Sequence, residues 1–350
     1  MVHYTDSFPG RTVAVNGTPH LYFGGTAYLG LQDHLHFQDI FIENTRRYGT
    51  NYGASRKSNV QFRVFHEAEA LLAQLVGSEA CLTLSSGYLA GQFLVQSLKS
   101  KTYRRFYAPN THSALFSKKN KNYHSYADLR HDVEGHLGSG SAATPVLFLD
   151  SIDFSGQNYP HFSALGALPL EDMYLVVDDS HGIGVVGKDG EGVFARLRAL
   201  GAKKLFMCCS LGKGFGIQGG AVFGHAADMD ALRDSVFFGG ASPASPAAMA
   251  TLVQAQGLYA QRRDKLRQNL NLFLDQVPRP NPFVHMAGHP TFGFQNNRLA
   301  AGLLQRKIIV THFNYPNDGA APVSRIVLSA AHTDRDIAQL TSAIGAILGR

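Results

Sequence analysis

Residues 204–216 read KLFMCCSLGKGFG, an apolar run that passes into a lysine enclosed by glycines, Lys213. The run has the length and composition of a buried strand. Glycines on both sides of Lys213 remove side chains that would keep a flat ligand away from its amine. A phosphate-binding loop is the alternative, but that pattern places a hydroxyl residue after the lysine, where this chain has Gly214. The stretch therefore predicts a strand that presents an amine to a planar ligand.

A second stretch, YLVVDDSHGIG at residues 174–184, lies about one strand-helix-strand crossover upstream of Lys213. Asp178 follows its apolar run, at the sheet edge where ligands bind in open α/β folds. A carboxylate there can keep a pyridine nitrogen protonated. A metal site formed by Asp178, Asp179 and His181 is the rival, but neighbouring residues of a strand point to opposite faces and no further ligand cluster is evident. Amine and carboxylate together indicate pyridoxal phosphate (PLP), and no metal is expected.

Strand-like runs recur along the chain and are separated by helical patterns, one of which occupies residues 62–76 and ends at Gly77. Another helix is expected over residues 88–98. This alternation predicts an α/β fold with a largely parallel sheet. The expected strands are residues 80–84, 105–108, 145–149, 174–177, 205–208 and 220–223.

Three regions are expected: an N-terminal arm of short strands over residues 1–44, a large domain over 45–277, and a small C-terminal domain over 278–350. The large domain is predicted to end in one long helix, residues 246–277, which the prolines of 278–282 terminate. The small domain alternates strands with helices, and its last helix opens at Thr333 with Asp336 three residues on, as in a capping box.

Composition is that of a globular chain, with 45% hydrophobic and 17% charged residues among 350. No apolar stretch approaches the ~20 residues that a membrane span needs. Without a basic segment followed by an apolar block at the N-terminus, a cytoplasmic location is expected. The three cysteines, Cys81, Cys208 and Cys209, are expected to be reduced core residues.

The net charge of +6 is concentrated in one stretch without acidic residues. It suits an anionic partner such as a nucleotide-bearing thioester, an acidic carrier protein or nucleic acid. A solvated surface is the simpler interpretation, and no nucleic-acid partner is predicted. The stretch contains Lys99, Lys101, Arg104, Arg105, Lys118, Lys119 and Lys121.

Three further positions could bind parts of a PLP–substrate complex. Ser86 and Gly87 join a strand to a helix, where free N–H groups can receive a phosphate. His112 follows another strand end, where its imidazole could stack on a ring, although an isolated histidine is more often structural. Arg325 precedes an apolar strand and could bind a carboxylate or form a surface salt bridge.

These strings, in this order, resemble the α-oxoamine synthases of the fold-type I PLP-dependent enzymes. The resemblance covers nearly the whole chain, and the strings DDSHGIG and GKGFG are its most specific parts. It implies a large domain of mainly parallel sheet flanked by helices and a smaller C-terminal α+β domain. Other matching strings are residues 28–31, 48–49, 86–88 and 330–332, with Arg56, His66, His112 and Arg325.

The resemblance also implies a role for each matching residue. Lys213 would form the imine with PLP, Asp178 would contact the pyridine nitrogen, and His181 would contact the ring hydroxyl. His112 would stack on the ring and Arg325 would take the substrate carboxylate, with Tyr28 beside the substrate. The phosphate would be held by Ser86, Gly87, Tyr88, Ser210 and Ser242. Family members are homodimers with shared active sites, so a homodimer is expected.

The chain departs from the family pattern at several places around the expected substrate. Thr26 and Ala27 replace polar residues before Tyr28, and the stretch 49–53 is bulkier than the family pattern at two positions. Residues 57–60 replace a Ser-Gly turn, and residues 238–241 lack the hydroxyls expected there, which leaves Ser242. Asp150 stands where the family has a glutamate. PLP binding is thus better supported than recognition of the acyl donor.

The resemblance implies a decarboxylating condensation of an amino acid with an acyl thioester, carried by CoA or by an acyl carrier protein, to an α-amino ketone. Lys213 is the candidate general base, and Asp178 the group that stabilises charge. An aminotransferase, or an aldolase-type lyase acting on a small amino acid, is the alternative. A non-catalytic binding module on the same scaffold is the third hypothesis, against which the presence of Lys213 argues.

Overall fold

The computed structural model describes residues 2–116, 123–315, 319 and 322–349. It divides into a small unit, Met1–Gln38 with Gly257–Arg350, and a large unit, Asp39–Gln256. These boundaries differ from the three regions expected from the sequence. Residues 1–38 of the expected N-terminal arm belong to the same unit as the C-terminal region, and the division falls after residue 256, where the sequence placed it after residue 277.

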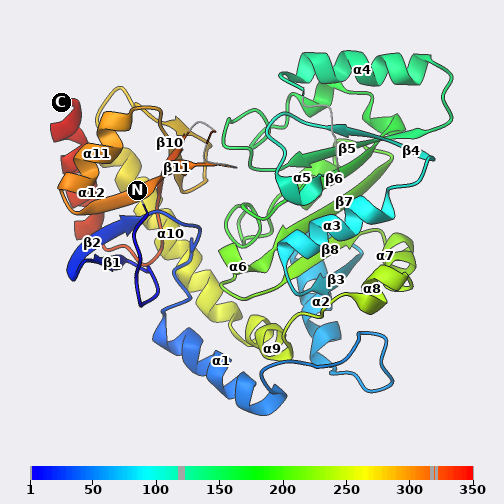
Figure 1. Ribbon diagram of the computed structural model, residues 1–350, viewed down its shortest axis with the longest axis horizontal. Helices are drawn as coiled ribbons and strands as arrows, with labels where there is room; N and C mark the ends of the chain where they lie inside the picture. Colours follow the sequence, from blue (N-terminus) through cyan, green and yellow to red (C-terminus); the bar gives the residue numbers. More distant parts are fainter. Residues whose placement is uncertain (1, 117–122, 316–318, 320–321, 350) are drawn as a thin grey trace. The chain divides into compact units, whose positions relative to one another are not determined.

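The large unit contains a six-stranded sheet in which the expected strands are all present (Figure 1). Its order is β3-β8-β7-β6-β5-β4, and the four strands from β7 to β4 are parallel, whereas β8 is antiparallel to both β7 and β3. The mainly parallel α/β fold is confirmed. The strands are β3 (Ala80–Leu84), β4 (Tyr103–Tyr107), β5 (Thr144–Asp150), β6 (Tyr174–Asp178), β7 (Lys204–Ser210) and β8 (Gly220–Gly224).

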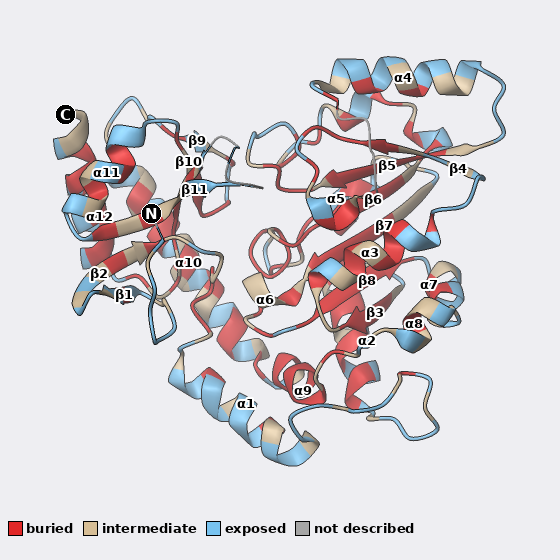
Figure 2. Cartoon of the chain, viewed as in Figure 1, coloured by how far each residue is buried: buried red, intermediate tan, exposed pale blue. Residues whose placement is uncertain are grey.

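The central strands are buried on both faces, as continuous apolar runs predict (Figure 2). One face packs through Val176 and Cys208 against Phe93 of α3, Gly87–Ser97. The predicted stop of α2, Val64–Val76, is confirmed, since Gly77 caps it in the left-handed conformation. The other helices of this unit are α4 (Tyr126–Gly138), α5 (Phe194–Arg198), α6 (Leu211–Gly214), α7 (Ala226–Arg233), α8 (Val236–Gly240) and α9 (Pro246–Gln254), and α1 (Leu35–Tyr48) enters it from the small unit.

The single long helix expected over residues 246–277 is wrong. Two helices occupy this segment, α9 and α10 (Gln256–Gln276), and they are separated at Ala255. Ala255 leaves helical geometry with ψ at 16°, although its N–H still donates to Thr251. The only sequence signal is Gly257, a poor helix former two residues on.

The small unit is built from both ends of the chain. Its sheet has the order β1-β2-β11-β12-β10-β9, and β2 and β11 pair in parallel although almost 300 residues separate them. The capping box of α12 is confirmed, and Arg11 forms an ion pair of 2.7 Å with Asp336 within that cap. The strands are β1 (Thr12–Val15), β2 (Thr18–Phe23), β9 (Val284–His285), β10 (Thr291–Gly293), β11 (Ile308–Asn314) and β12 (Pro322–Val327), with α11 (Asn297–Gln305) and α12 (Asp334–Leu348).

Two expectations from composition can be compared with the described residues. Cys81, Cys208 and Cys209 are buried free thiols, as expected, and burial raises the pKa of each. Among the helices of the described ranges, none combines the length and the apolar character that crossing a bilayer requires.

Candidate functional site

The carboxyl ends of β6 and β7 carry the two groups that the sequence singled out. Asp178 is the last residue of β6, and β7 ends at Ser210, from which α6 places Lys213. The Nζ atom of Lys213 lies 2.8 Å from Nε2 of His181. Amine, imidazole and carboxylate therefore come from adjacent strand ends of one sheet.

Ser180 joins these two strand ends. Its backbone N–H donates to Oδ1 of Asp178 at 2.8 Å, and its hydroxyl accepts a hydrogen bond of 2.8 Å from the backbone N–H of Ser210. Asp178 is buried, with only 6% of its surface exposed. Ser180 is a positioning group that the sequence analysis passed over, although it stands inside the motif between Asp178 and His181.

Asp179 has a different role from its neighbour. Its carboxylate is fully buried and accepts hydrogen bonds from the hydroxyl of Ser151 and, at 3.2 Å, from the backbone N–H of Val193. Burial raises the pKa of Asp179 to about 7. In the described part of the chain, no three His, Cys, Asp or Glu side chains gather as a metal would need. Asp179 thus organises the loop beneath the site.

His112 follows β4 in the chain and contacts the end of β5, the strand next to β6 in the sheet. Its Nδ1 accepts the N–H of Ala114 at 3.2 Å, and its own backbone N–H donates to the Asp150 carboxylate at 2.5 Å. Burial lowers the pKa of His112, while the charge of Asp178 acts to raise it and that of Lys213 to lower it. His112 therefore lies within the electrostatic reach of both groups.

Asp150 is a site residue that the sequence analysis noted only as a departure from the family. It pairs in register with Asp178 across β5 and β6, so two carboxylates end neighbouring strands. Burial, and then the charge of Asp178, raise the pKa of Asp150 well above its usual value. The sequence does contain a signal for this role, because Asp150 ends an apolar run just as Asp178 does.

The N-terminus of α3 forms the third part of the site. Ser86 caps it, accepting the N–H of Leu89 at 3.1 Å. A Cβ atom at Gly87 would lie 2.6 Å from Cα of Ser210, so only glycine permits this approach. Ser242 contacts this region through its backbone, because its carbonyl oxygen accepts a hydrogen bond of 3.1 Å from the N–H of Ser85. Tyr88 is 58% exposed.

A second glycine contact fixes the lysine loop. A Cβ at Gly214 would lie 2.3 Å from the carbonyl oxygen of Ile183, and Gly184 adopts a φ of 79° beside it. The loop after β6 therefore lies directly against α6, and Lys213 is held next to His181. The glycines that surround Lys213 in the sequence serve backbone packing as well as ligand access.

Arg325 and Tyr28 belong to the small unit. Arg325 lies on β12 opposite Gly293 and Thr311, and burial lowers its pKa. Tyr28 is almost fully buried, which raises its pKa, and the charge of Arg325 acts on it in the opposite direction. The structure thus places these two predicted substrate residues near each other in one unit and the other predicted residues in the other unit.

The large-unit groups fit PLP in kind. An amine can react with its aldehyde, a buried carboxylate can face its ring nitrogen, an imidazole can stack, and a capped helix N-terminus with a serine can receive its phosphate. The close approach at Gly87 brings the helix N-terminus to Ser210, at the end of the strand that precedes Lys213. This donor set includes Lys213, Asp178, His112, Ser86 and Ser210.

Comparison with known proteins agrees with this assignment. The chain is 28% identical over 363 residues to the 8-amino-7-oxononanoate synthase of Nitrosomonas eutropha, covering 96% of this chain and 92% of that one. It is 30% identical over 273 residues to the synthase of that name from Chromobacterium violaceum, covering 75% and 70%.

Solved structures show the same fold. Serine palmitoyltransferase of Sphingomonas wittichii superposes with a TM-score of 0.81 at 18% identity, covering 99% of this chain and 91% of that one. The 8-amino-7-oxononanoate synthase of Francisella tularensis gives 0.69 at 20% identity, covering 94% and 98%. The family model described as aminotransferase class I and II matches residues 160–344. The chain belongs to the class I and II aminotransferase family, and its resemblance to the α-oxoamine synthases is confirmed.

Proposed function

We propose that this protein is a PLP-dependent acyltransferase that condenses an amino acid with an acyl thioester. Carbon dioxide and the free thiol leave, and the product is an α-amino ketone. The observation that carries the PLP-dependent part of the proposal is the 2.8 Å approach of the Lys213 amine to His181, together with the buried Asp178. The names of the relatives, 8-amino-7-oxononanoate synthase, support acyl transfer.

Each site residue of the large unit is proposed to have a separate role in the reaction. Bound PLP would supply an electron-withdrawing ring that accepts the electron pair left on the amino acid Cα. Lys213 would bind the aldehyde and, once displaced by substrate, move the proton at Cα. Asp178 would keep the ring nitrogen protonated, and His181 would hold the ring hydroxyl. His112 would fix the tilt of the ring by stacking on it.

Other residues are proposed to hold the substrate and the phosphate. Arg325 is proposed to bind the amino acid carboxylate with two parallel hydrogen bonds, with Tyr28 beside it. Ser86, Gly87, Tyr88 and Ser210 would bind the phosphate. Ser242, which is exposed, is proposed to reach the phosphate of a second copy in a homodimer.

The alternative reactions use the same lysine. An aminotransferase or an aldolase-type lyase would need the Lys213 amine and Asp178 equally, so the geometry of these two groups does not separate them. The names of the relatives favour acyl transfer. A non-catalytic binding module would have no use for an amine held against an imidazole.

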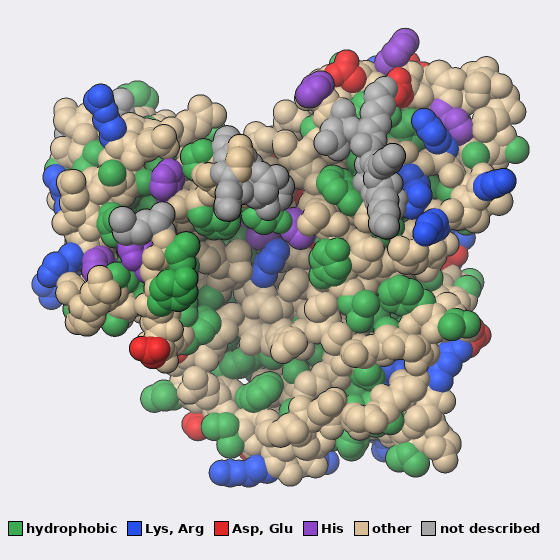
Figure 3. Space-filling model, in the orientation of Figure 1, with side chains coloured by type: hydrophobic (Ala, Val, Ile, Leu, Met, Phe, Trp, Pro, Cys, Tyr) green, Lys and Arg blue, Asp and Glu red, His purple; other side chains and the backbone are tan. Residues whose placement is uncertain are grey.

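An acidic carrier protein or CoA is proposed as the acyl donor. Several Lys and Arg side chains lie near β4 (Figure 3), and Lys99, Lys101 and Arg104 are exposed. Their charge would attract phosphates or an acidic domain. The other lysines of this basic stretch, Lys118, Lys119 and Lys121, lie outside the described residues.

The test is to add single amino acids and an acyl thioester to the PLP-loaded protein. With the amino acid that is the true substrate, we expect the protein to release free thiol and carbon dioxide in equal amounts. Conversion of PLP to pyridoxamine phosphate without thiol release would instead identify an aminotransferase. Release of an aldehyde from a β-hydroxy amino acid would identify a lyase. A protein that never binds PLP would refute all three.

A further inference from the structure

Phe154 has an unusual backbone for an aromatic residue. It lies in the loop that follows β5, and its φ is 56°, in the left-handed region. A bulky side chain is rarely found there, because its Cβ crowds the neighbouring carbonyl group. Such strained residues concentrate at active sites and persist only where the surrounding structure enforces them.

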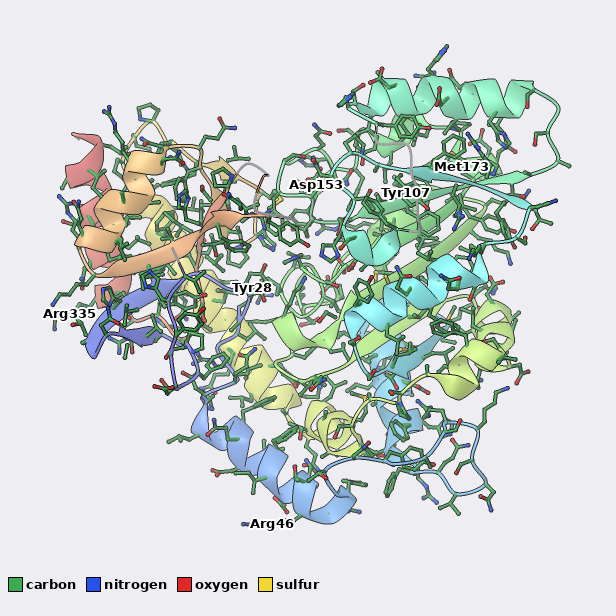
Figure 4. The ribbon with its side chains drawn as sticks, viewed as in Figure 1. Tyr28, Arg46, Tyr107, Asp153, Met173 and Arg335 are labelled. Carbon is green, nitrogen blue, oxygen red and sulfur yellow. The ribbon has the colours of Figure 1, made fainter. Side chains whose placement is uncertain are left out.

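The loop around Phe154 is fixed by four hydrogen bonds. The buried carboxylate of Asp153 (Figure 4) accepts the N–H groups of Ser155 and Gly156, at 3.2 and 3.1 Å, and the Ser155 hydroxyl at 2.6 Å. The side-chain amide of Asn158 donates to the carbonyl of Asp150 at 2.7 Å. These bonds close the loop at both ends and leave Phe154 in the left-handed conformation between them.

In this conformation the ring of Phe154 packs against the imidazole of His181. Its centroid lies 4.8 Å from that of the His181 imidazole, with an interplanar angle of 79°, which is a favourable edge-to-face arrangement. His181 in turn lies 2.8 Å from the Lys213 amine. A chain of contacts therefore runs from the Asp153 turn through Phe154 and His181 to Lys213.

We infer that Phe154 is a positioning residue that holds His181 against Lys213, and that its strained backbone serves this placement. Without the Phe154 ring, the imidazole would lose this packing contact and would be held less firmly in the orientation that faces Lys213. The inference rests on the proposed function, since it assigns Phe154 a part in retaining PLP. Phe154 itself lies outside the motif strings.

A glycine substitution at position 154 separates the effect of the strained backbone from the effect of the aromatic ring. Phe154→Gly removes the ring and also relieves the backbone, because glycine adopts positive φ freely. The PLP-free variant is expected to melt at the same or a higher temperature than the wild type. Its PLP, followed by absorbance after dilution, is expected to leave roughly two- to tenfold faster, the range that an aromatic pair of this kind contributes.

Two variants control the experiment. Phe154→Leu keeps the strain and loses the aromatic edge, so it is expected to release PLP faster without gaining stability. Lys307→Gly relieves a similar φ of 59° at an exposed position of the small unit, so it is expected to change stability only.

The outcomes are distinct. Unchanged PLP release in Phe154→Gly and Phe154→Leu would overturn the inference. A lower melting temperature together with faster release in Phe154→Gly would also overturn it, because a purely structural residue behaves in that way. Failure of the wild type to bind PLP would instead refute the proposed function.

Discussion

Two histidines, His181 in the large unit and His332 in the small unit, both lie within strings that resemble the α-oxoamine synthases, yet their surroundings differ. His332 is 1% exposed and stacks on Phe23 with a centroid distance of 3.9 Å. Its Nδ1 accepts the N–H of Ser329 and its Nε2 bonds to the carbonyl of Tyr22, both at 3.0 Å. Both ring nitrogens therefore bind the backbone.

His181 has other partners. It is half-buried, its Nε2 faces the Lys213 amine, and an aromatic edge contacts its ring. The difference teaches that membership of a motif does not distinguish a histidine that serves chemistry from one that joins strands. What distinguishes them is whether the ring nitrogens bind backbone groups or a reactive side chain.

The largest effect is expected from Lys213→Ala, which removes the group that His181 touches. Turnover should fall by about 10³-fold or more, and the colour of bound PLP should disappear, because the amine proposed to bind PLP is removed. Circular dichroism and the melting temperature of the PLP-free protein should stay near wild type. Lys203→Ala, at an exposed position next to β7, is the matched control and should retain both properties. Full activity in Lys213→Ala would refute the mechanism.

His332→Ala tests the other side of the comparison. It leaves the N–H of Ser329 and the carbonyl of Tyr22 without partners and opens a cavity beside Phe23. The free energy of unfolding in urea is expected to fall by about 3 kcal/mol at pH 7. The folded variant should still bind PLP, and His161→Ala, at an exposed position, should change stability by less than about 0.5 kcal/mol. Loss of PLP binding with unchanged stability would reverse the assigned role.

The stabilising effect of His332 should depend on pH. Burial lowers its pKa to about 4 in the folded protein, whereas an exposed histidine has a pKa of about 6.5. Between these values the unfolded chain binds a proton that the folded chain does not. Its contribution is therefore complete above pH 6.5 and is lost as the pH falls toward 4.

Urea unfolding at a series of pH values measures how the stabilisation by His332 depends on pH. The difference between the wild type and His332→Ala should shrink by about 3 kcal/mol from pH 7 to pH 4. Asp336, whose carboxylate is bound by Arg11, is present in both proteins, and its charge acts to raise the pKa of His332 against the effect of burial. A difference that stays constant with pH would show that His332 titrates as an exposed group.

The same comparison shows what the sequence could predict. Strong apolar runs located all six strands of the large sheet, and their polar ends located Lys213 and Asp178, because both signals are local. The parallel pairing of β2 with β11 had no local signal, since it joins opposite ends of the chain. The strained φ of Phe154 could not be predicted either, because the surrounding turn enforces a conformation that the residue itself disfavours.

Arg325→Lys asks whether the small unit contributes to chemistry as well as to structure. A lysine keeps the charge but cannot form two parallel hydrogen bonds with a carboxylate. The KM for the amino acid is expected to rise about tenfold, with kcat and the melting temperature close to wild type. Tyr28→Phe removes only the neighbouring hydroxyl and should raise the KM by no more than a few-fold. An unchanged KM in Arg325→Lys would leave the predicted residues of the small unit with structural roles alone, and the carboxylate would then need another partner.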